Sequence, residues 1–176
     1  MIAALVVALA CSLLTVSAKT VTYDFDIGWL QANPDGLHRR PVIGINGNWP
    51  IPTIEANLGD KLRINVKNSL GNETTSLHFH GLFQQDSANN DGIPMVTQCP
   101  ITPGQAFTYE MTAYPAGTFW YHSHSAGQYP DGLRGALIVH DKDRERKLDY
   151  EKEYLLTTSD WCVLICNSYL TPSGCV

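Results

Sequence analysis

Alternation of apolar and polar residues with a period of two runs through the chain and limits the folds open to it. The alternation is clear over residues 20–27, 61–67 and 107–111. It predicts half-buried antiparallel strands, because successive side chains of a strand point to opposite faces of the sheet. The short apolar run at residues 135–140 (GALIVH) predicts a more buried strand.

Turn-forming residues separate these segments at short intervals. They are found at residues 33–36 (NPDG), 46–48 (NGN), 58–60 (LGD), 90–92 (NDG), 102–104 (TPG) and 130–132 (PDG). No long amphipathic helix is predicted before residue 140. Many short strands joined by frequent turns predict an all-β fold, a β-sandwich of Greek-key type.

The N-terminal end of the chain does not follow this pattern. Residues 2–14 are nearly all apolar, and residues 16–18 (VSA) have the small-x-small form of a cleavage site. Residues 1–18 are therefore predicted to be a signal peptide. A signal anchor is the alternative, but the run is short for a membrane span and lacks basic flanks. Residues 72–74 (NET) form a glycosylation sequon, which agrees with a secreted or cell-surface glycoprotein.

A run of charge marks the predicted end of the folded domain. Residues 141–153 hold 11 charged side chains in 13 positions, which is typical of a solvated linker or a surface helix. We therefore expect one domain over residues 19–142. Residues 143–176 are interpreted as a linker and the truncated start of a second domain, with residues 153–158 as the candidate start of a further strand.

Charge and cysteine usage exclude two classes of protein. Charged residues make up 16% of the chain and the net charge is -5, so no basic face for nucleic acid is predicted. A disulfide-stapled small protein would spread its cysteines along the chain. Here Cys11 lies in the predicted signal peptide, and three of the other four lie in the last 15 residues, which leaves their disulfide state open. These four are Cys99, Cys162, Cys166 and Cys175.

Four of the six histidines form two identical patterns, at residues 78–80 (HFH) and 122–124 (HSH). On a strand, residues i and i+2 share a face, so each pair of imidazoles projects to one side. Two such strands side by side would bring four imidazoles together. Leu77 and Phe79 take the other face and are predicted to enter the core, whereas Trp120 is predicted to pack on the histidine side.

Four clustered imidazoles predict a metal site, for which copper, zinc, iron and nickel are all suitable. Side chains that stand parallel on a strand reach neighbouring ions more readily than a single ion, which favours more than one metal. A cupin site would need a carboxylate three or four residues after an HxH pair. Phe83 and Gln84 follow the first pair at that distance and Gln128 follows the second. No Ser-His-Asp arrangement and no phosphate-binding loop is visible.

Several further segments in the same order resemble one family. They are residues 46–60 (NGNWPIPTIEANLGD), 78–81 (HFHG), 91–101 (DGIPMVTQCPI), 117–124 (GTFWYHSH) and 127–135 (GQYPDGLRG). Over residues 20–161 the chain resembles the first, cupredoxin-like domain of multicopper oxidases, the family of laccases, ascorbate oxidases and iron ferroxidases. Residues 32–50 most resemble the fungal iron-transport ferroxidases, whose members pair with an iron permease.

The resemblance implies roles for particular residues. His78 would bind the type 2 copper, and His80, His122 and His124 would bind the type 3 pair. Asp91 matches an acid that is a candidate proton donor to oxygen. The resemblance further implies that the last domain of a complete member supplies the other four of eight histidines and a blue, type 1 copper. Electrons from Fe2+ or a phenol would pass from there to O2, which is reduced to water.

The chain departs from the family in what it lacks. It has no further HxH group and no blue-copper cysteine motif, and His38 and His140 stand alone. Cys99 matches a cysteine that laccases pair with a distant part of the chain, so we expect it to be free or paired with the tail. We therefore expect a copper-binding N-terminal domain that is inactive alone, and whether the chain acts as an enzyme stays open. The alternatives are a non-enzymatic secreted copper or zinc binder and a fragment without function.

Overall fold

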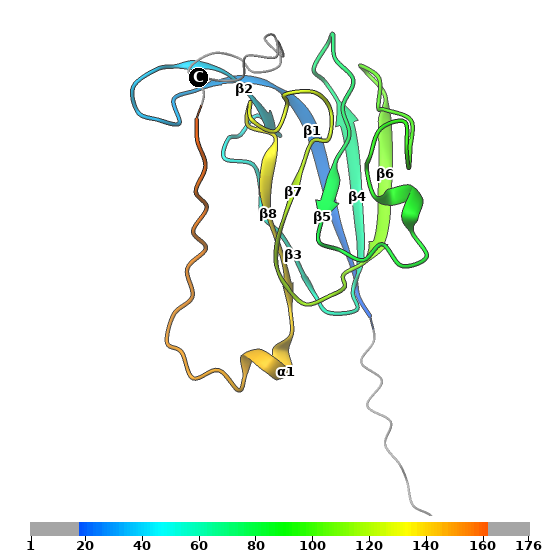
Figure 1. Ribbon diagram of the computed structural model, residues 1–176, viewed down its shortest axis with the longest axis vertical. Helices are drawn as coiled ribbons and strands as arrows, with labels where there is room; N and C mark the ends of the chain where they lie inside the picture. Colours follow the sequence, from blue (N-terminus) through cyan, green and yellow to red (C-terminus); the bar gives the residue numbers. More distant parts are fainter. Residues whose placement is uncertain (1–17, 162–176) are drawn as a thin grey trace, which may run out of the picture.

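Two four-stranded sheets pack face to face in the computed structural model of the protein, which describes residues 18–161 (Figure 1). In spatial order the first sheet contains β2 (Arg40–Ile45), β1 (Thr20–Ala32), β4 (Lys61–Asn68) and β6 (Ala106–Thr112). The second contains β3 (Ile54–Asn57), β8 (Arg134–His140), β7 (Gly117–His122) and β5 (His78–His80). The predicted all-β sandwich is confirmed. Within the described residues, helix is limited to η1 (Ala88–Asn90) and α1 (Lys142–Glu145).

Strand pairing is antiparallel in four of the six pairs and parallel in two. β1 runs parallel to β4, and β3 runs parallel to β8. The expectation of antiparallel pairing throughout is wrong at these two places. The reason is the path of the chain, which leaves the first sheet after β2, forms β3 in the second sheet and returns as β4 beside β1.

Alternation along β4 builds the centre of the core. In the register of the first sheet, Ile64 lies between Tyr23 of β1 and Tyr109 of β6. Leu62, Ile64 and Val66 are at most 1% exposed, as their alternation with charged residues predicts. Each such side chain contributes roughly 1.5–3 kcal/mol through burial.

Aromatic rings from the two sheets meet between the layers. The ring of Phe25 in β1 stacks on that of Tyr121 in β7 at 5.8 Å. Phe79 in β5 meets Tyr109 in β6 edge to face at 5.2 Å. The contact of Phe79 with Tyr109 holds the short strand β5, which carries the first histidine pair, against the opposite sheet.

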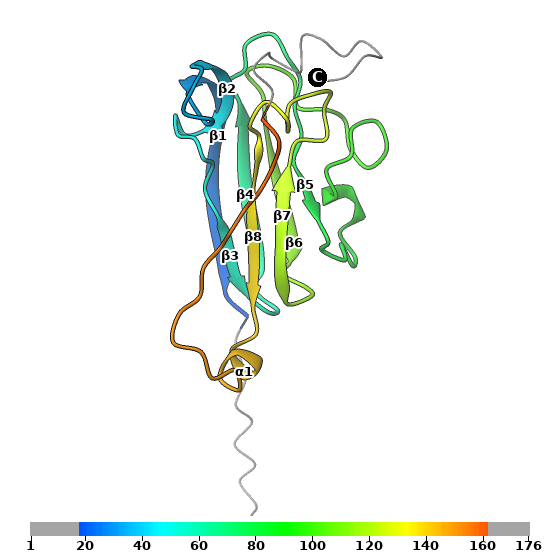
Figure 2. The ribbon, with the colours of Figure 1, turned by 60° about the vertical axis from the view of Figure 1, so that its left-hand side comes forward.

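The charged run after β8 forms the four-residue helix α1 and then an extended segment. The Asp141 carboxylate caps α1 by accepting hydrogen bonds from the backbone N–H groups of Asp143 and Arg144. Residues 151–160 are exposed, and the predicted strand at residues 153–158 is wrong, because no strand of either sheet pairs with this segment. The segment returns along the sandwich from the end that carries α1 to the opposite end (Figures 1 and 2).

Trp161, at the end of this segment, packs against Trp49 and Arg40. Its ring lies 5.3 Å from that of Trp49 and 4.3 Å from the guanidinium of Arg40. The predicted signal peptide and the three C-terminal cysteines lie outside the described residues, apart from Ala18 at the predicted cleavage site. No helix between residues 18 and 161 is long and apolar enough to cross a membrane.

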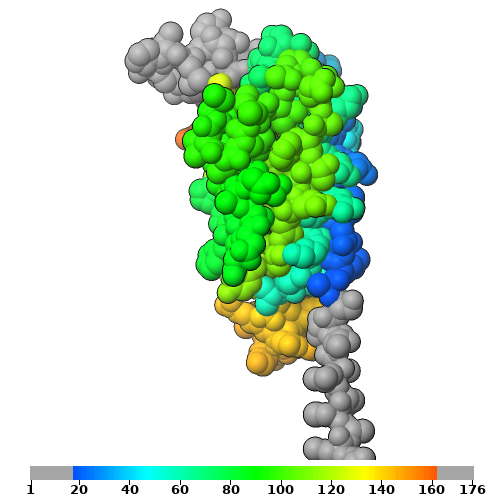
Figure 3. Space-filling model, turned by 90° about the vertical axis from the view of Figure 1, so that its right-hand side faces the viewer, coloured from blue at the N-terminus to red at the C-terminus, as the bar shows by residue number. Residues whose placement is uncertain are grey.

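The long connection between β5 and β6, residues 81–105, covers much of one face of the molecule (green in Figure 3). It carries Asp91 and the exposed Cys99, whose thiol forms no disulfide within residues 18–161. Asn72 of the glycosylation sequon lies before β5 in the sequence and is exposed in the turn that follows β4.

Candidate metal centre

The two HxH segments lie side by side on β5 and β7. These strands are antiparallel neighbours, with His78 opposite His122 and His80 opposite Trp120. Because i and i+2 share a face, this register places His78, His80 and His122 on the same face of the sheet. Leu77 and Phe79 are fully buried, as predicted.

The four imidazoles form one cluster. The ring of His78 is 5.4 Å from those of His80 and His122 and 5.7 Å from that of His124. The ring of His122 is 5.8 Å from that of His80 and 6.1 Å from that of His124. One ring nitrogen from each of His78, His80 and His122 lies within 4.8 Å of the others, a spacing that can hold a metal ion.

Backbone carbonyls fix the tautomers of two of the histidines. The Nδ1 of His78 is 2.6 Å from the carbonyl oxygen of Asp91, and the Nδ1 of His122 is 2.8 Å from that of Ser123. A carbonyl oxygen only accepts, so in both rings Nδ1–H donates and Nε2 keeps a lone pair. A histidine that binds a metal through one ring nitrogen usually donates a hydrogen bond from the other, often to a backbone carbonyl.

The Nε2 of His122 is the atom that fits a metal best. The residue is 6% exposed, and this nitrogen is buried without a hydrogen-bond partner in the part of the chain that the structure describes. Burial, together with a smaller effect of the neighbouring imidazoles, lowers the pKa of His122 to about 4, against the opposing effect of the Ser123 carbonyl. A buried polar atom without a partner costs free energy. A metal ion bound to Nε2 would remove that cost, so the donor set fits the copper of the predicted site.

Aromatic side chains cover part of the cluster. Trp120 stacks on His122 with 3.9 Å between ring centroids, and Tyr129 meets the same imidazole edge to face at 5.4 Å. The predicted packing role of Trp120 is thus seen directly. His80 and His124 are exposed, so the cluster opens to the surface on their side.

Asp91 lies against this cluster. Its carboxylate Oδ1 is 3.3 Å from the Nδ1 of His78, and its side chain is 29% exposed. The carboxylate therefore lies between solvent and the histidine ring.

His38 and His140 lie outside the cluster, as their isolated positions predicted. The Nδ1 of His140 is 2.9 Å from Glu145 of α1, and its Nε2 is 3.5 Å from Glu55 of β3. Partial burial lowers the pKa of His140, but the hydrogen bonds and charges of Glu145 and Glu55 outweigh this and raise the pKa above its ordinary 6.5. His140 therefore ties α1 to the edge of the second sheet.

This contact predicts a pH-dependent contribution to stability. Since the folded pKa is raised, the stabilisation is complete below pH 6.5 and is lost as the pH rises through the folded value. His140→Gln is expected to lower the free energy of unfolding by up to about 1 kcal/mol at pH 5.5 and by less at pH 8.5. Urea unfolding at both values measures this. The control His38→Gln removes an imidazole that is 61% exposed and should change neither value. Equal losses from His140→Gln at the two pH values would contradict the assignment.

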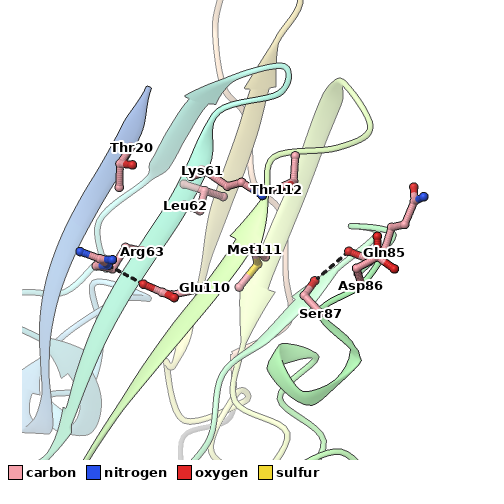
Figure 4. A pocket seen from close by; sticks show the side chains of 10 residues that line it. All are labelled: Thr20, Lys61, Leu62, Arg63, Gln85, Asp86, Ser87, Glu110, Met111 and Thr112. Atoms are coloured by element: carbon pink, nitrogen blue, oxygen red, sulfur yellow. Dashed lines mark hydrogen bonds and ion pairs between the residues drawn. The ribbon is translucent and has the colours of Figure 1, made fainter. Parts of the chain in front are cut away.

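A pocket beside β4 and β6 is separate from this cluster (Figure 4). Its lining includes the exposed ion pair in which Arg63 Nε donates to Glu110 Oε1 at 2.6 Å. None of the four histidines lines it. The lining residues are Thr20, Lys61, Leu62, Arg63, Gln85, Asp86, Ser87, Glu110, Met111 and Thr112.

The family model for multicopper oxidases matches residues 26–144, which include both histidine pairs. The chain belongs to the multicopper oxidase family. Members of this family use copper, and the fold class and family predicted from the motifs are confirmed.

Individual relatives are similar over most of this chain. An iron transport multicopper oxidase, fetC of Epichloe festucae, is 56% identical over 153 residues, which are 87% of this chain and 25% of that protein. The iron transport multicopper oxidase FET3 of Saccharomyces cerevisiae is 48% identical over 145 residues, 82% of this chain and 22% of that protein. This chain therefore spans about a quarter of the length of the relatives it matches.

Solved structures agree. The crystal structure of Fet3p, a multicopper oxidase that functions in iron import, superposes with a TM-score of 0.70 at 46% identity, covering 77% of this chain and 25% of that one. A laccase from Botrytis aclada superposes with a TM-score of 0.68 at 43% identity, covering 71% of this chain and 23% of that one. Both likenesses support a cupredoxin-like domain.

Sequence reasoning missed the polar contacts that hold the cluster in place. Gln128 is buried between the two histidine segments, although it lies in a turn-rich stretch that reads as surface loop. Tyr129 was not singled out either. No periodic signal marks either residue, because both follow the end of β7, where the alternation stops.

Proposed function

We propose that this chain is the copper-binding, N-terminal cupredoxin domain of a secreted or cell-surface multicopper oxidase of the iron-transport type. It supplies His78 to a type 2 copper and His80, His122 and His124 to a type 3 pair. The observation that carries the proposal is the Nε2 of His122, which is buried in the cluster of four imidazoles and has no hydrogen-bond partner among the described residues. Identity of 48–56% to iron transport oxidases supports this branch of the family.

Bound copper would supply the one-electron chemistry that joins oxidation of a reductant to reduction of O2 to water. The chain's own residues prepare the site for it. The carbonyls of Asp91 and Ser123 orient the rings of His78 and His122 so that Nε2 is available. Trp120 covers one side of His122 and keeps water from it. The Asp91 side chain, next to His78 and reachable from solvent, is the candidate proton donor to the site.

The proposals for the reductant and the partner are supported by the names of the relatives. Two of these relatives are named iron transport multicopper oxidases, and Fet3p is described as functioning in iron import. Fe2+ is therefore proposed as the reductant of the complete oxidase, with phenols as the laccase-like alternative. An iron permease is the proposed partner, since oxidised iron that is to be imported needs a transport protein.

The 176-residue chain is expected to bind copper but not to catalyse the reduction of O2. It offers four clustered imidazoles, and beyond them only His38 and His140, which lie apart. The test loads the purified secreted chain with Cu(II) and records copper content, visible absorption and O2 uptake with Fe2+ or a phenol. We expect bound copper, no intense blue band, and O2 uptake equal to the rate without protein. A blue, oxygen-consuming chain would show that a partner or a second copy completes the site.

Competition with zinc tests the alternative of a non-enzymatic metal binder. Imidazole sites bind Cu(II) more tightly than Zn(II) in general, so affinity alone is not decisive. A chain that retains zinc against an equal concentration of copper would contradict the copper assignment. A chain that binds neither metal would contradict a metal site altogether.

A further inference from the structure

Gln128 joins the chain segments that lead to the two histidine pairs. It is 1% exposed, and its Oε1 accepts hydrogen bonds from the hydroxyls of Thr75 at 2.8 Å and Ser123 at 2.7 Å. Its Nε2 donates to the carbonyl of Thr74 at 2.8 Å and to Glu73 Oε2 at 3.2 Å. The side chain thus uses both acceptor sites and both donor protons of its amide.

The two hydroxyls depend on this amide. Thr75 is fully buried and Ser123 is 1% exposed, so neither can turn to solvent for another partner. Thr75 lies three residues before His78, and Ser123 lies between His122 and His124. A buried polar network of this kind is rigid when every member is satisfied and costly when one is removed.

His124 is the histidine that most needs such support. β7 ends at His122, so the ladder between β5 and β7 orients three of the imidazoles but not His124. The loop that carries His124 is held around Ser123. The Ser123 N–H donates to the Leu133 carbonyl at 3.0 Å, and the Ser125 N–H donates to the Ser123 hydroxyl oxygen at 3.1 Å.

The backbone of Gln128 is itself fixed on both sides. Its N–H donates to the carbonyl of Ser125 at 3.2 Å, and its carbonyl accepts from the N–H of Leu133 at 3.1 Å. Gln128 therefore connects the hydroxyl of Ser123 to Leu133, which directly precedes β8, and to the segment before β5.

We infer that Gln128 is a positioning residue of the metal centre, which holds His124 beside His78 through the hydroxyl of Ser123. The inference rests on the proposed function, since it concerns copper binding at the same site. Gln128 does not touch the metal. It fixes the loop whose imidazole would complete the set of four.

The test compares Cu(II) affinity of the secreted chain and of its Gln128→Met variant by competition with a chelator. Methionine has a similar length and volume but cannot form the four hydrogen bonds. Loss of a group hydrogen-bonded to a metal ligand lowers metal affinity by about 10–100-fold. Gln128 acts on His124 one bond further out, through Ser123, so we expect a loss at the lower end, about 10-fold. The electron paramagnetic resonance spectrum of bound Cu(II) should also show coupling to fewer nitrogens. Gln84→Met, which removes a glutamine amide bonded to Met111 and Ser87 away from the cluster, is the control and should change neither.

Two single-hydroxyl variants separate positioning from simple stabilisation. Ser123→Ala and Thr75→Val each remove one buried hydrogen bond to the same Gln128 oxygen, and Ser123→Ala also removes the hydrogen bond that the Ser125 N–H donates to the Ser123 hydroxyl. Only Ser123→Ala removes the link to the His124 loop, so it should reproduce the copper loss of Gln128→Met, whereas Thr75→Val should change affinity by less than about threefold. Equal copper losses from both would show that the network only stabilises the fold, and would overturn the inference. If Gln128→Met does not fold, this pair decides the question.

Amide hydrogen exchange of the metal-free chain distinguishes a failure of the inference about Gln128 from a failure of the proposed function. In Gln128→Met the Ser125 amide should exchange at least about 10-fold faster, while amides of β4 and β6 keep their protection. A wild-type chain that binds no copper would overturn the proposed function and this inference together. A chain that binds copper normally while Gln128→Met matches it in affinity and exchange would overturn the inference alone.

Discussion

Replacing His122 with leucine is expected to lower the affinity of the chain for Cu(II) by about 100-fold or more. His122 is the most buried of the four histidines and has an imidazole neighbour on each side of it in the cluster. Its Nε2 is buried and has no hydrogen-bond partner within residues 18–161. Loss of a group that is hydrogen-bonded to a metal ligand already lowers metal affinity by about 10–100-fold. Loss of the ligand itself should therefore lower the affinity by at least the upper value.

The measurement is competition with a chelator at pH 6, where the pKa of about 4 leaves Nε2 of His122 without a proton. Leucine fills most of the volume next to Trp120, so the metal-free variant is expected to stay folded. His140→Gln removes an imidazole outside the cluster and should bind copper as the wild-type chain does. An affinity of His122→Leu within threefold of wild type would mean that copper binds elsewhere.

Period-two spacing was sufficient to predict much of this site. The i, i+2 rule placed His78 and His80 on one face, with Phe79 in the core, because the direction of a strand side chain is set by the backbone. The same rule was incomplete for the second pair. His124 lies beyond the last residue of β7, so its place depends on hydrogen bonds of Ser123 and Gln128 rather than on the ladder.

Sheet topology was less accessible to sequence reasoning. Alternation shows that β1 and β4 are half-buried strands, but it carries no information on which strand lies beside which. The parallel pairing of β1 with β4 is fixed by the excursion of the chain through the second sheet. Residues 153–158 have strand-like composition but pair with no strand of either sheet, and they stay extended and exposed. The same limit applies to Gln128, whose role is visible only when its partners are placed.

Gly92→Ala is expected to be the most damaging small substitution near the centre. Gly92 has a φ of +84°, in the region that side chains other than glycine rarely adopt. A Cβ at this position would lie 1.8 Å from the carbonyl oxygen of Leu77 and 2.9 Å from the Cα of His78. These are backbone atoms at the start of β5, so no side-chain rotation can relieve the collision.

The absence of a side chain at Gly92 therefore lets the segment after η1 lie directly on β5. This close approach is what brings the carbonyl of Asp91 to 2.6 Å from the Nδ1 of His78. In the alanine variant either the segment or β5 must move. We expect the free energy of unfolding to fall by about 3 kcal/mol or more, the sum of backbone strain and overpacking. Copper affinity should fall by about 10-fold because the ring of His78 loses its fixed orientation.

Gly104→Ala is the matched control that separates the two causes. Gly104 has a similar φ of +77°, but a Cβ there would meet no atom within 4 Å. Replacing Gly104 should lower the free energy of unfolding by about 1–2 kcal/mol through backbone strain alone, and it should leave copper affinity unchanged. Urea unfolding of the metal-free chains and chelator competition give both quantities for both variants. If the two substitutions destabilise the chain equally and Gly92→Ala binds copper like wild type, the contact between residues 91–92 and β5 does not position His78. The orientation of that ring would then have to come from the ladder between β5 and β7 alone.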